Sequence, residues 1–385
     1  MKILLVGGAG FIGSRTALRL LGAGHTPVVF DPLDAQTHGS DPSASPTLTS
    51  LKGKVEVVCG DTRDAGALAA AVSGAEAVYY FPACTGTGQS MYEAGKYCDV
   101  NVHGAGVFAD VLAVCRDQVA RVIISSSRAV YGEGAAECRE HGKVFPNQRR
   151  EEYLSVGRFD SLCPHCGSNV APLPSSESDP ARPVSIYGIT KLAQEQIIDC
   201  ACRSLGISCV TFRYQNVYGE GQSLKNPYTG ILSIFTQLLL AGRAIELFED
   251  GKPGRDFVHV DDVVEYNFRA LDRPVAEGFV ANVGCGVSSS LVDLVGAIAK
   301  ALDREPAYSV SGRYRMGDVR HAVADLSHLQ AAFGQHEFVG LEAGVRAFVE
   351  WVRAMGAEPG ANERFDRSLD EMRAAGLLRG PESSR

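Results

Sequence analysis

Short apolar runs along this chain alternate with longer segments in which apolar residues recur every three or four positions. Short runs bounded by turn residues are typical of buried strands in a parallel sheet, and the longer periodic segments predict helices. The apolar runs are residues 2–6, 26–30, 55–59, 77–83, 122–124 and 210–212, and the helical segments include residues 14–21, 101–114 and 187–202. This alternation predicts an α/β fold with a doubly wound parallel sheet.

Composition and charge narrow the class of protein. The chain has 385 residues, of which 45% are hydrophobic and 21% charged, so it can bury a full core. A net charge of -8 argues against a nucleic-acid partner, because phosphate binding requires a basic face. No apolar run reaches the roughly 20 residues that span a bilayer, and no signal-peptide layout is seen, so we expect a cytoplasmic protein. Most of the 11 cysteines stand singly in apolar segments, where reduced thiols are expected.

A glycine turn links the first strand to the first helix. Gly7 permits the tight turn, Gly10 lets the backbone approach a pyrophosphate, and Gly13 lets helix and strand pack closely. The spacing is typical of dinucleotide binding, although a structural glycine turn would look the same. Asp31 ends the second strand, where an acid binds the ribose hydroxyls and favours NAD over NADP. Arg15 would instead favour NADP, but the ordinary role of an arginine here is that of a solvated helix residue.

Two further segments follow in the first half of the chain. Residues 32–50 are rich in Ser, Thr, Asp and Pro and are expected to form an exposed loop. Asp61 follows the third strand, at the edge of the sheet where ligands bind. It is expected either to meet the adenine of the dinucleotide or to cap the helix that follows it, and the sequence favours neither.

A tyrosine and a lysine stand four residues apart at the start of the helix expected over residues 187–202. This separation places Tyr187 and Lys191 on one helix face. A nearby ammonium favours the phenolate, so the pair could supply a base near neutral pH. The same spacing also occurs by chance on many solvated helix faces. The serine run 125–127, at the end of an apolar strand, adds a hydroxyl to this candidate catalytic site.

The segment between Tyr131 and Ser185 carries two short motifs of metal-ligand type. Cys138 and His141 form the first, and Cys163 and Cys166 form the second. Four such ligands suit a tetrahedral zinc with no open position, which implies a structural role. The alternative is a polar loop with reduced surface thiols.

These features together resemble the extended short-chain dehydrogenase/reductases, in particular the NAD-dependent nucleotide-sugar epimerases and dehydratases. The resemblance covers roughly residues 1–355. Besides the motifs above, it depends on residues 81–83, Asn101 with Gly104, and residues 125–132, 213–219, 255–262, 282–284 and 315–318. The inserted segment, with residues 31–39 and 226–230, is similar to the branch of dTDP-L-rhamnose 4-epimerases.

The resemblance implies a division of the chain and a role for each site residue. Residues 1–212 would form a Rossmann-type NAD-binding domain, with a zinc-binding insert at 133–182 and a return at 256–284. Residues 213–255 and 285–355 would form a smaller interleaved α/β domain for the nucleotide sugar, followed by residues 356–385 as a tail or surface helix. The catalytic residues would be Ser127, Tyr187 and Lys191. The NAD contacts would be Gly7, Gly10, Phe11, Ile12, Gly13, Asp31, Asp61, Thr62, Phe81, Ala83, Asn101, Ser125, Tyr187, Lys191 and Tyr214. The substrate contacts would be Thr85, Arg128, Asn216, Arg255, Arg315 and Asp318.

The resemblance also implies the reaction. Tyr187 would take a proton from the sugar hydroxyl while a hydride moves to NAD, and the hydride would return to the other face of the ketone. Dehydration is not expected, since Arg128 and Ala129 occupy the place of the dehydratases' acid. A 4-ketoreductase or dehydrogenase and a non-catalytic sugar-nucleotide-binding protein remain alternatives. For Arg255 and Arg315 a salt bridge between domains is the alternative to diphosphate binding. The helices at 101–114 and 187–202 would form a homodimer contact.

Overall fold

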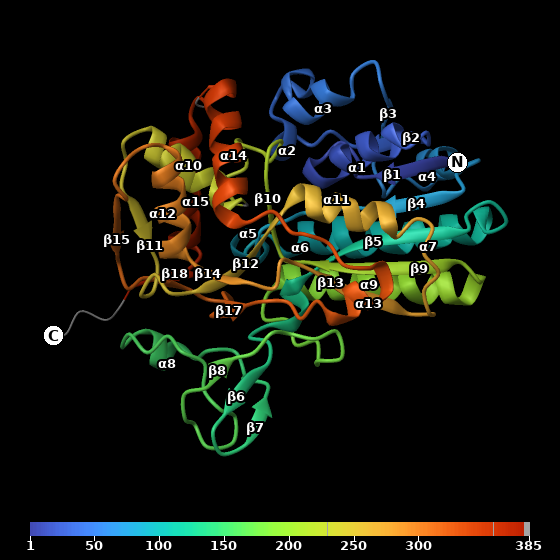
Figure 1. The fold of residues 1–385 in the computed structure, drawn as a ribbon. Helices are drawn as coiled ribbons and strands as arrows, with labels where there is room; N and C mark the ends of the chain where they lie inside the picture. The colour runs from blue at the N-terminus through green and yellow to red at the C-terminus, as the bar shows by residue number, and fades with distance from the viewer. Residues whose placement is uncertain (229, 357, 381–385) are drawn as a thin grey trace.

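Seven parallel strands form the central sheet of the computed structural model, which describes residues 1–228, 230–356 and 358–380 (Figure 1). The order across the sheet is β13-β9-β5-β4-β1-β2-β3. The bounds are β1 Lys2–Val6, β2 Thr26–Asp31, β3 Glu56–Cys59, β4 Ala77–Tyr80, β5 Arg121–Ser127, β9 Ser208–Tyr214 and β13 Phe279–Val283. The predicted α/β fold and each of the six predicted strands are therefore confirmed. The order reverses between β1 and β4, where sheets of this kind bind ligands.

Alternate side chains of each strand bury on opposite faces of the sheet. Ile3 and Leu5 join one core, and Leu4 and Val6 join the other. The helices of the first core are α1 (Phe11–Gly22), α11 (Val260–Arg269) and α13 (Ser327–Phe333). Those of the second are α4 (Ala65–Val72), α7 (Gly104–Cys115) and α9 (Ile186–Leu205). Both faces of the sheet are thus covered by helices, as the continuous apolar strands require.

A separate apolar core lies beside the carboxyl ends of the sheet strands. Its helices are α10 (Ile231–Leu240), α12 (Leu291–Ala301) and α14 (Leu341–Met355). A small sheet joins β10 (Asn216–Tyr218), β12 (Gly254–His259), β14 (Ser288–Ser290) and β17 (His321–Ala322), and further pairs are β11 (Ile245–Leu247) with β15 (Tyr308–Val310) and β16 (Tyr314–Arg315) with β18 (Leu378–Arg379). His259 ends β12 in this small sheet, whereas the strand that returns to the large sheet is β13.

One segment departs from the expected division of the chain, and the C-terminal stretch forms one of its two expected structures. Helix α13 buries Leu329 and Phe333 in a core of the large sheet, although residues 285–355 were expected to lie apart from it. In the C-terminal stretch, α15 (Ala361–Ala374) and β18 bury Leu369, Met372 and Leu378 together. The expected helix is therefore present there, while residues 357 and 381–385 of the stretch, like Thr229 earlier, lie outside the described residues.

The loop expected at residues 32–50 is more ordered and more buried than its composition indicates. It contains α2 (Ala35–His38), η1 (Pro42–Ala44) and α3 (Pro46–Leu51). His38 is 2% exposed, and its Nδ1 lies 3.1 Å from Ser45 Oγ. The expectation that this loop is exposed is thus wrong for His38 and Ser45, because hydroxyl groups inside the loop satisfy the buried polar side chains.

The helix expected from Asn101 begins earlier and is irregular. It runs from α6 (Ala94–Tyr97) through a π-helical segment, η2 (Cys98–His103), into α7. By length and mean hydropathy, 22 residues and 1.3, Ala94–Cys115 could cross a membrane, although the sequence analysis expected no such segment. Phe108 and Leu112 of α7 are nevertheless buried against the sheet, and α7 packs against α9, as expected of a core helix.

The segment inserted after β5 forms a lobe at the lower edge of Figure 1. It contains β6 (Ala136–Cys138), β7 (Gly142–Val144), α8 (Glu151–Leu154) and β8 (Ala171–Pro172). Its small core consists of Ala136, Cys138, Val144 and Cys163. A core of this size stabilises little by itself, so the lobe depends on other interactions.

Candidate active site

The glycine turn has the geometry expected of a dinucleotide site. Gly7 has a φ of +69°, and a Cβ on Gly13 would lie 2.6 Å from the Cα of Gly8. The tight turn and the close packing are therefore both present. Gly10 precedes the first turn of α1, which includes Phe11 and Ile12, so the N–H groups of that turn are available to a phosphate.

Asp31 lies beside this turn at the end of β2. Its carboxylate accepts hydrogen bonds from Ala9 N at 3.0 Å and Leu33 N at 2.8 Å. Burial raises the pKa of Asp31, and His38 opposes this rise with Nε2 at 3.8 Å. His38 was not predicted as a site residue, because nothing in its neighbourhood indicated that it would fold back onto Asp31.

Asp61 follows β3 and pairs with a neighbouring arginine. Arg63 Nε donates to Asp61 Oδ1 at 2.9 Å, and this bond holds the pKa of the carboxyl below its usual range. The alternative role of helix cap is wrong, because Asp64 Oδ1 accepts from Ala67 N at the start of α4. Thr62 beside it is buried.

Asn101 holds the loop after β4. Its Oδ1 accepts from Cys84 N at 2.7 Å, and its Nδ2 donates to Thr190 Oγ1 at 2.9 Å. The same loop presents the Thr85 carbonyl, which accepts from Tyr97 at 2.6 Å. Of the other expected cofactor contacts, Phe81 and Ala83 are half-buried, and Ser125 and Tyr214 are buried. The Tyr214 hydroxyl donates to Asn267 Oδ1 at 2.6 Å, within a core of the large sheet.

Ser127 ends β5, and Tyr187 lies in the first turn of α9. Ser185 caps that turn by accepting from Gly188 N at 3.1 Å, and Tyr187 N donates to Ser90 Oγ at 3.0 Å. Burial raises the pKa of Tyr187, while a hydrogen bond with Ser127 and the charge of Arg128 lower it. The structure thus brings the expected serine and tyrosine side chains together.

Lys191 lies one turn further along α9 and is 2% exposed. Its amine donates to Gln194 Oε1, and burial lowers its pKa to about 7 against the opposing charge of Glu195. Here Arg128 acts on the pKa of Tyr187, whereas the sequence analysis expected Lys191 to do so. Gln194 was missed, because a glutamine at this spacing has no distinctive signature.

Of the expected substrate residues, Arg128 lies next to Tyr187. Arg128 Nε donates to Asn216 Oδ1 at 2.8 Å, and Arg315 pairs with Asp318 at 2.8 Å. Burial lowers the pKa of Arg128, with Asp318 and Tyr187 opposing. Burial and the charge of Arg128 lower the pKa of Arg255 to about 9. The guanidinium of Arg255 donates to the carbonyls of Gly254, Val319 and Arg320.

The four expected metal ligands also meet. Their ligand atoms lie within 4.8 Å of one another, with Cys138 Sγ 3.6 Å from His141 Nδ1 and 3.7 Å from Cys166 Sγ, and Cys163 Sγ 3.7 Å from His141 Nδ1. A tetrahedron with metal–sulfur bonds of about 2.3 Å has edges of about 3.8 Å. The donor set and its spacing therefore fit a tetrahedral metal ion.

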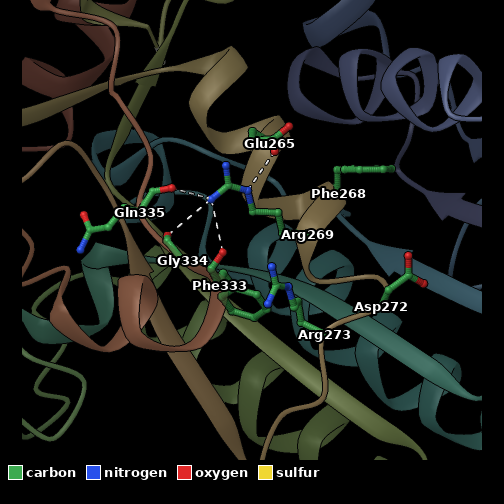
Figure 2. Close-up of a pocket in the computed structure, with 8 residues that line it drawn as sticks. All are labelled: Glu265, Phe268, Arg269, Asp272, Arg273, Phe333, Gly334 and Gln335. Carbon is green, nitrogen blue, oxygen red and sulfur yellow. Dashed lines mark hydrogen bonds and ion pairs between the residues drawn. The ribbon is translucent and has the colours of Figure 1, made fainter.

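A surface pocket of about 490 Å³ lies elsewhere, between α11 and α13 (Figure 2). One of its arginines, Arg269, pairs with Glu265 at 2.9 Å and donates to the carbonyls of residues 333–335. The residues that line it are Glu265, Phe268, Arg269, Asp272, Arg273, Phe333, Gly334 and Gln335, and none of them is an expected site residue.

The sequence model of the NAD-dependent epimerase/dehydratase family matches residues 3–155 and 164–284, and the chain belongs to this family. The chain is 38% identical to the dTDP-L-rhamnose 4-epimerase of Burkholderia thailandensis, over 91% of this chain and 94% of that protein. It is 30% identical to the UDP-glucose 4-epimerase of Mycolicibacterium smegmatis, over 92% and 99%. The Thermus thermophilus UDP-glucose 4-epimerase in complex with NAD has a TM-score of 0.72 at 25% identity, over 92% and 100%. The expected family is confirmed.

Proposed function

We propose that this protein is an NAD-dependent nucleotide-sugar 4-epimerase that acts on a dTDP-6-deoxyhexose such as dTDP-L-rhamnose. The observation that carries the proposal is the meeting of buried Ser127 with half-buried Tyr187 at the carboxyl edge of the sheet, next to a dinucleotide turn. The relative named a dTDP-L-rhamnose 4-epimerase, at 38% identity, supports the choice of sugar.

NAD bound at the glycine turn and Asp31 would supply the hydride acceptor, and later the hydride donor, for the sugar carbon. Tyr187 as phenolate takes the proton of the C4 hydroxyl, and Ser127 donates a hydrogen bond to the same oxygen. The 4-keto sugar would turn in the site so that its other face is presented to the nicotinamide, and Tyr187 would then give the proton back to the C4 oxygen. No net oxidation results. The charge of Arg128 favours the phenolate.

The part of the chain around the separate core of α10, α12 and α14 would bind the nucleotide end of the substrate. Arg255 donates to three carbonyl oxygens, so these contacts leave its positive charge available for a diphosphate. Arg315 and Asp318 lie on the neighbouring segment, and Thr85 would border the sugar. A homodimer through α7 and α9 belongs to the same proposal, supported by exposed Val114 and Ile189, and light scattering would test it.

To test this function, the purified protein is incubated without added cofactor with dTDP-L-rhamnose, and separately with UDP- and GDP-sugars. We expect NMR to show interconversion of the dTDP-sugar at C4, with no accumulation of NADH. In a parallel incubation with NAD, net reduction of the NAD would support a dehydrogenase. Binding of the sugar nucleotide without turnover would support a non-catalytic protein. Either outcome would contradict the proposal.

We further propose a structural zinc at Cys138, His141, Cys163 and Cys166, which would supply folding energy to the small lobe. We expect purified protein to contain about one zinc per chain. Cys163→Ser should lose the metal and several kcal/mol of unfolding free energy, because the lobe has little core of its own. Cys59→Ser, at an exposed cysteine outside the cluster, is the control for metal analysis and thermal unfolding. Equal zinc content in the two variants would contradict this assignment.

A further inference from the structure

The inserted lobe contacts the rest of the molecule through a buried charge cluster of Glu133, Arg149, Glu249 and Arg320. Arg149 lies 3.1 Å from Glu133 and 2.8 Å from Glu249, and Arg320 lies 2.9 Å from Glu249. The four side chains are 1–5% exposed. Glu133 and Arg149 come from the lobe, whereas Glu249 follows β11 and Arg320 precedes β17, so the cluster joins parts of the chain that are far apart in sequence.

Stability alone does not explain this cluster. Removing charges from water costs several kcal/mol per ion, and apolar residues of similar volume often stabilise equally well. Glu249 also has a φ of +54°, in the left-handed region that is uncommon for a non-glycine residue. Backbone strain of this kind persists where the surrounding structure holds a functional geometry.

The cluster holds residues 318–320. Arg149 Nη2 donates to the carbonyl of Asp318 at 2.9 Å, and Glu133 Oε2 accepts from Arg320 N at 3.0 Å. On its other side, this segment holds Arg255, whose guanidinium donates to Val319 O at 2.8 Å and Arg320 O at 3.0 Å. The lobe thus fixes the carbonyl oxygens that orient Arg255.

Two further residues of the lobe contact the charge cluster, and both stand close in sequence to an expected metal ligand. Ser161 Oγ donates to Glu133 at 2.9 Å, and Asp160 pairs with Arg320 at 3.0 Å. Asp160 and Ser161 stand three and two positions before Cys163, while Cys138 ends the strand that follows Glu133. A metal ion bound between these two segments would fix Glu133 and Asp160 relative to each other.

We propose that the metal-binding lobe is a positioning device for the diphosphate end of the substrate, which it controls through the buried charge cluster. This proposal rests on the proposed function, because it takes Arg255 to bind a nucleoside diphosphate. In this arrangement Arg149 is a positioning residue that acts through residues 318–320.

The test measures binding of dTDP and UDP by calorimetry, which needs no turnover, together with KM, kcat and NAD content. Arg149→Lys keeps a charge but loses the forked contacts, and chelation removes the metal from the holoenzyme. We expect each to weaken nucleotide binding and raise KM roughly 10-fold, the loss expected of one charged hydrogen bond. We expect kcat and NAD content to stay within twofold. The matched control is Arg150→Lys, at an arginine whose side chain is 74% exposed.

Asp160→Asn, at a half-exposed partner of Arg320, is the second variant if Arg149→Lys does not fold. Unchanged nucleotide affinity in the folded variants and in the chelated enzyme would overturn the proposal. So would a loss of NAD in parallel with nucleotide affinity, since that would mark general unfolding. Wild-type protein that epimerises no sugar but binds dTDP with this dependence would contradict the proposed function and leave the positioning role supported.

Discussion

Replacing Tyr187 with phenylalanine is expected to lower kcat for epimerisation roughly a thousandfold, the range that general acid–base catalysis contributes. The phenol is the group that removes the proton in the proposed mechanism, and its pKa responds to Ser127 and Arg128. The hydrogen bond from Tyr187 N to Ser90 Oγ uses the backbone of Tyr187, so the variant keeps it. We therefore expect a folded protein with unchanged NAD content, measured by absorbance after denaturation.

The matched control is Tyr308→Phe, which removes a hydroxyl from an exposed tyrosine on β15. Its kcat should equal that of the wild type. Turnover of the Tyr187 variant at the rate of this control would mean that another group removes the proton, and the assignment of the site would fail.

Replacing Glu195 with glutamine is expected to lower the free energy of unfolding by about 3–5 kcal/mol. Glu195 and Arg213 form a buried pair at 2.6 Å, and both side chains are under 9% exposed. Ser126 also donates to Glu195 at 2.8 Å. The variant leaves the Arg213 charge buried without its partner, which is costly in a medium of low dielectric constant. Urea denaturation measures the effect.

A second ion pair on the same helix provides the control. Asp199 pairs with Arg203 at 2.9 Å, but the arginine side chain is 45% exposed. Asp199→Asn should therefore cost less than about 1 kcal/mol. Equal losses of unfolding free energy in the two variants would show that burial of the Glu195–Arg213 pair has little effect on what the pair contributes to stability.

The strands and the glycine turn could be predicted because their signals are local. Apolar runs of strand length and a Gly-x-x-Gly-x-x-Gly spacing need no knowledge of distant residues, and both appear in the structure as expected. The two short cysteine and histidine motifs were also recognisable, because each has ligand spacing within a few residues.

Contacts between distant segments could not be predicted. The bond between Glu133 and Arg320 joins residues 187 positions apart, and neither has a sequence signature that distinguishes it from a surface charge. Lys191 was expected to act on Tyr187, but its orientation toward Gln194 follows from side-chain packing in the folded chain. Burial of His38 likewise depends on how its loop folds back onto Asp31.

The last strand of the large sheet has a consequence for synthesis of the chain. β13 pairs with β9, with Phe279 opposite Val210, yet six of the strands are complete at Tyr214. While the ribosome makes residues 215–283, the edge of β9 has no neighbour and can pair with another nascent chain. Chaperone capture during this interval would therefore protect the growing protein, and once β13 is added this edge of β9 is closed.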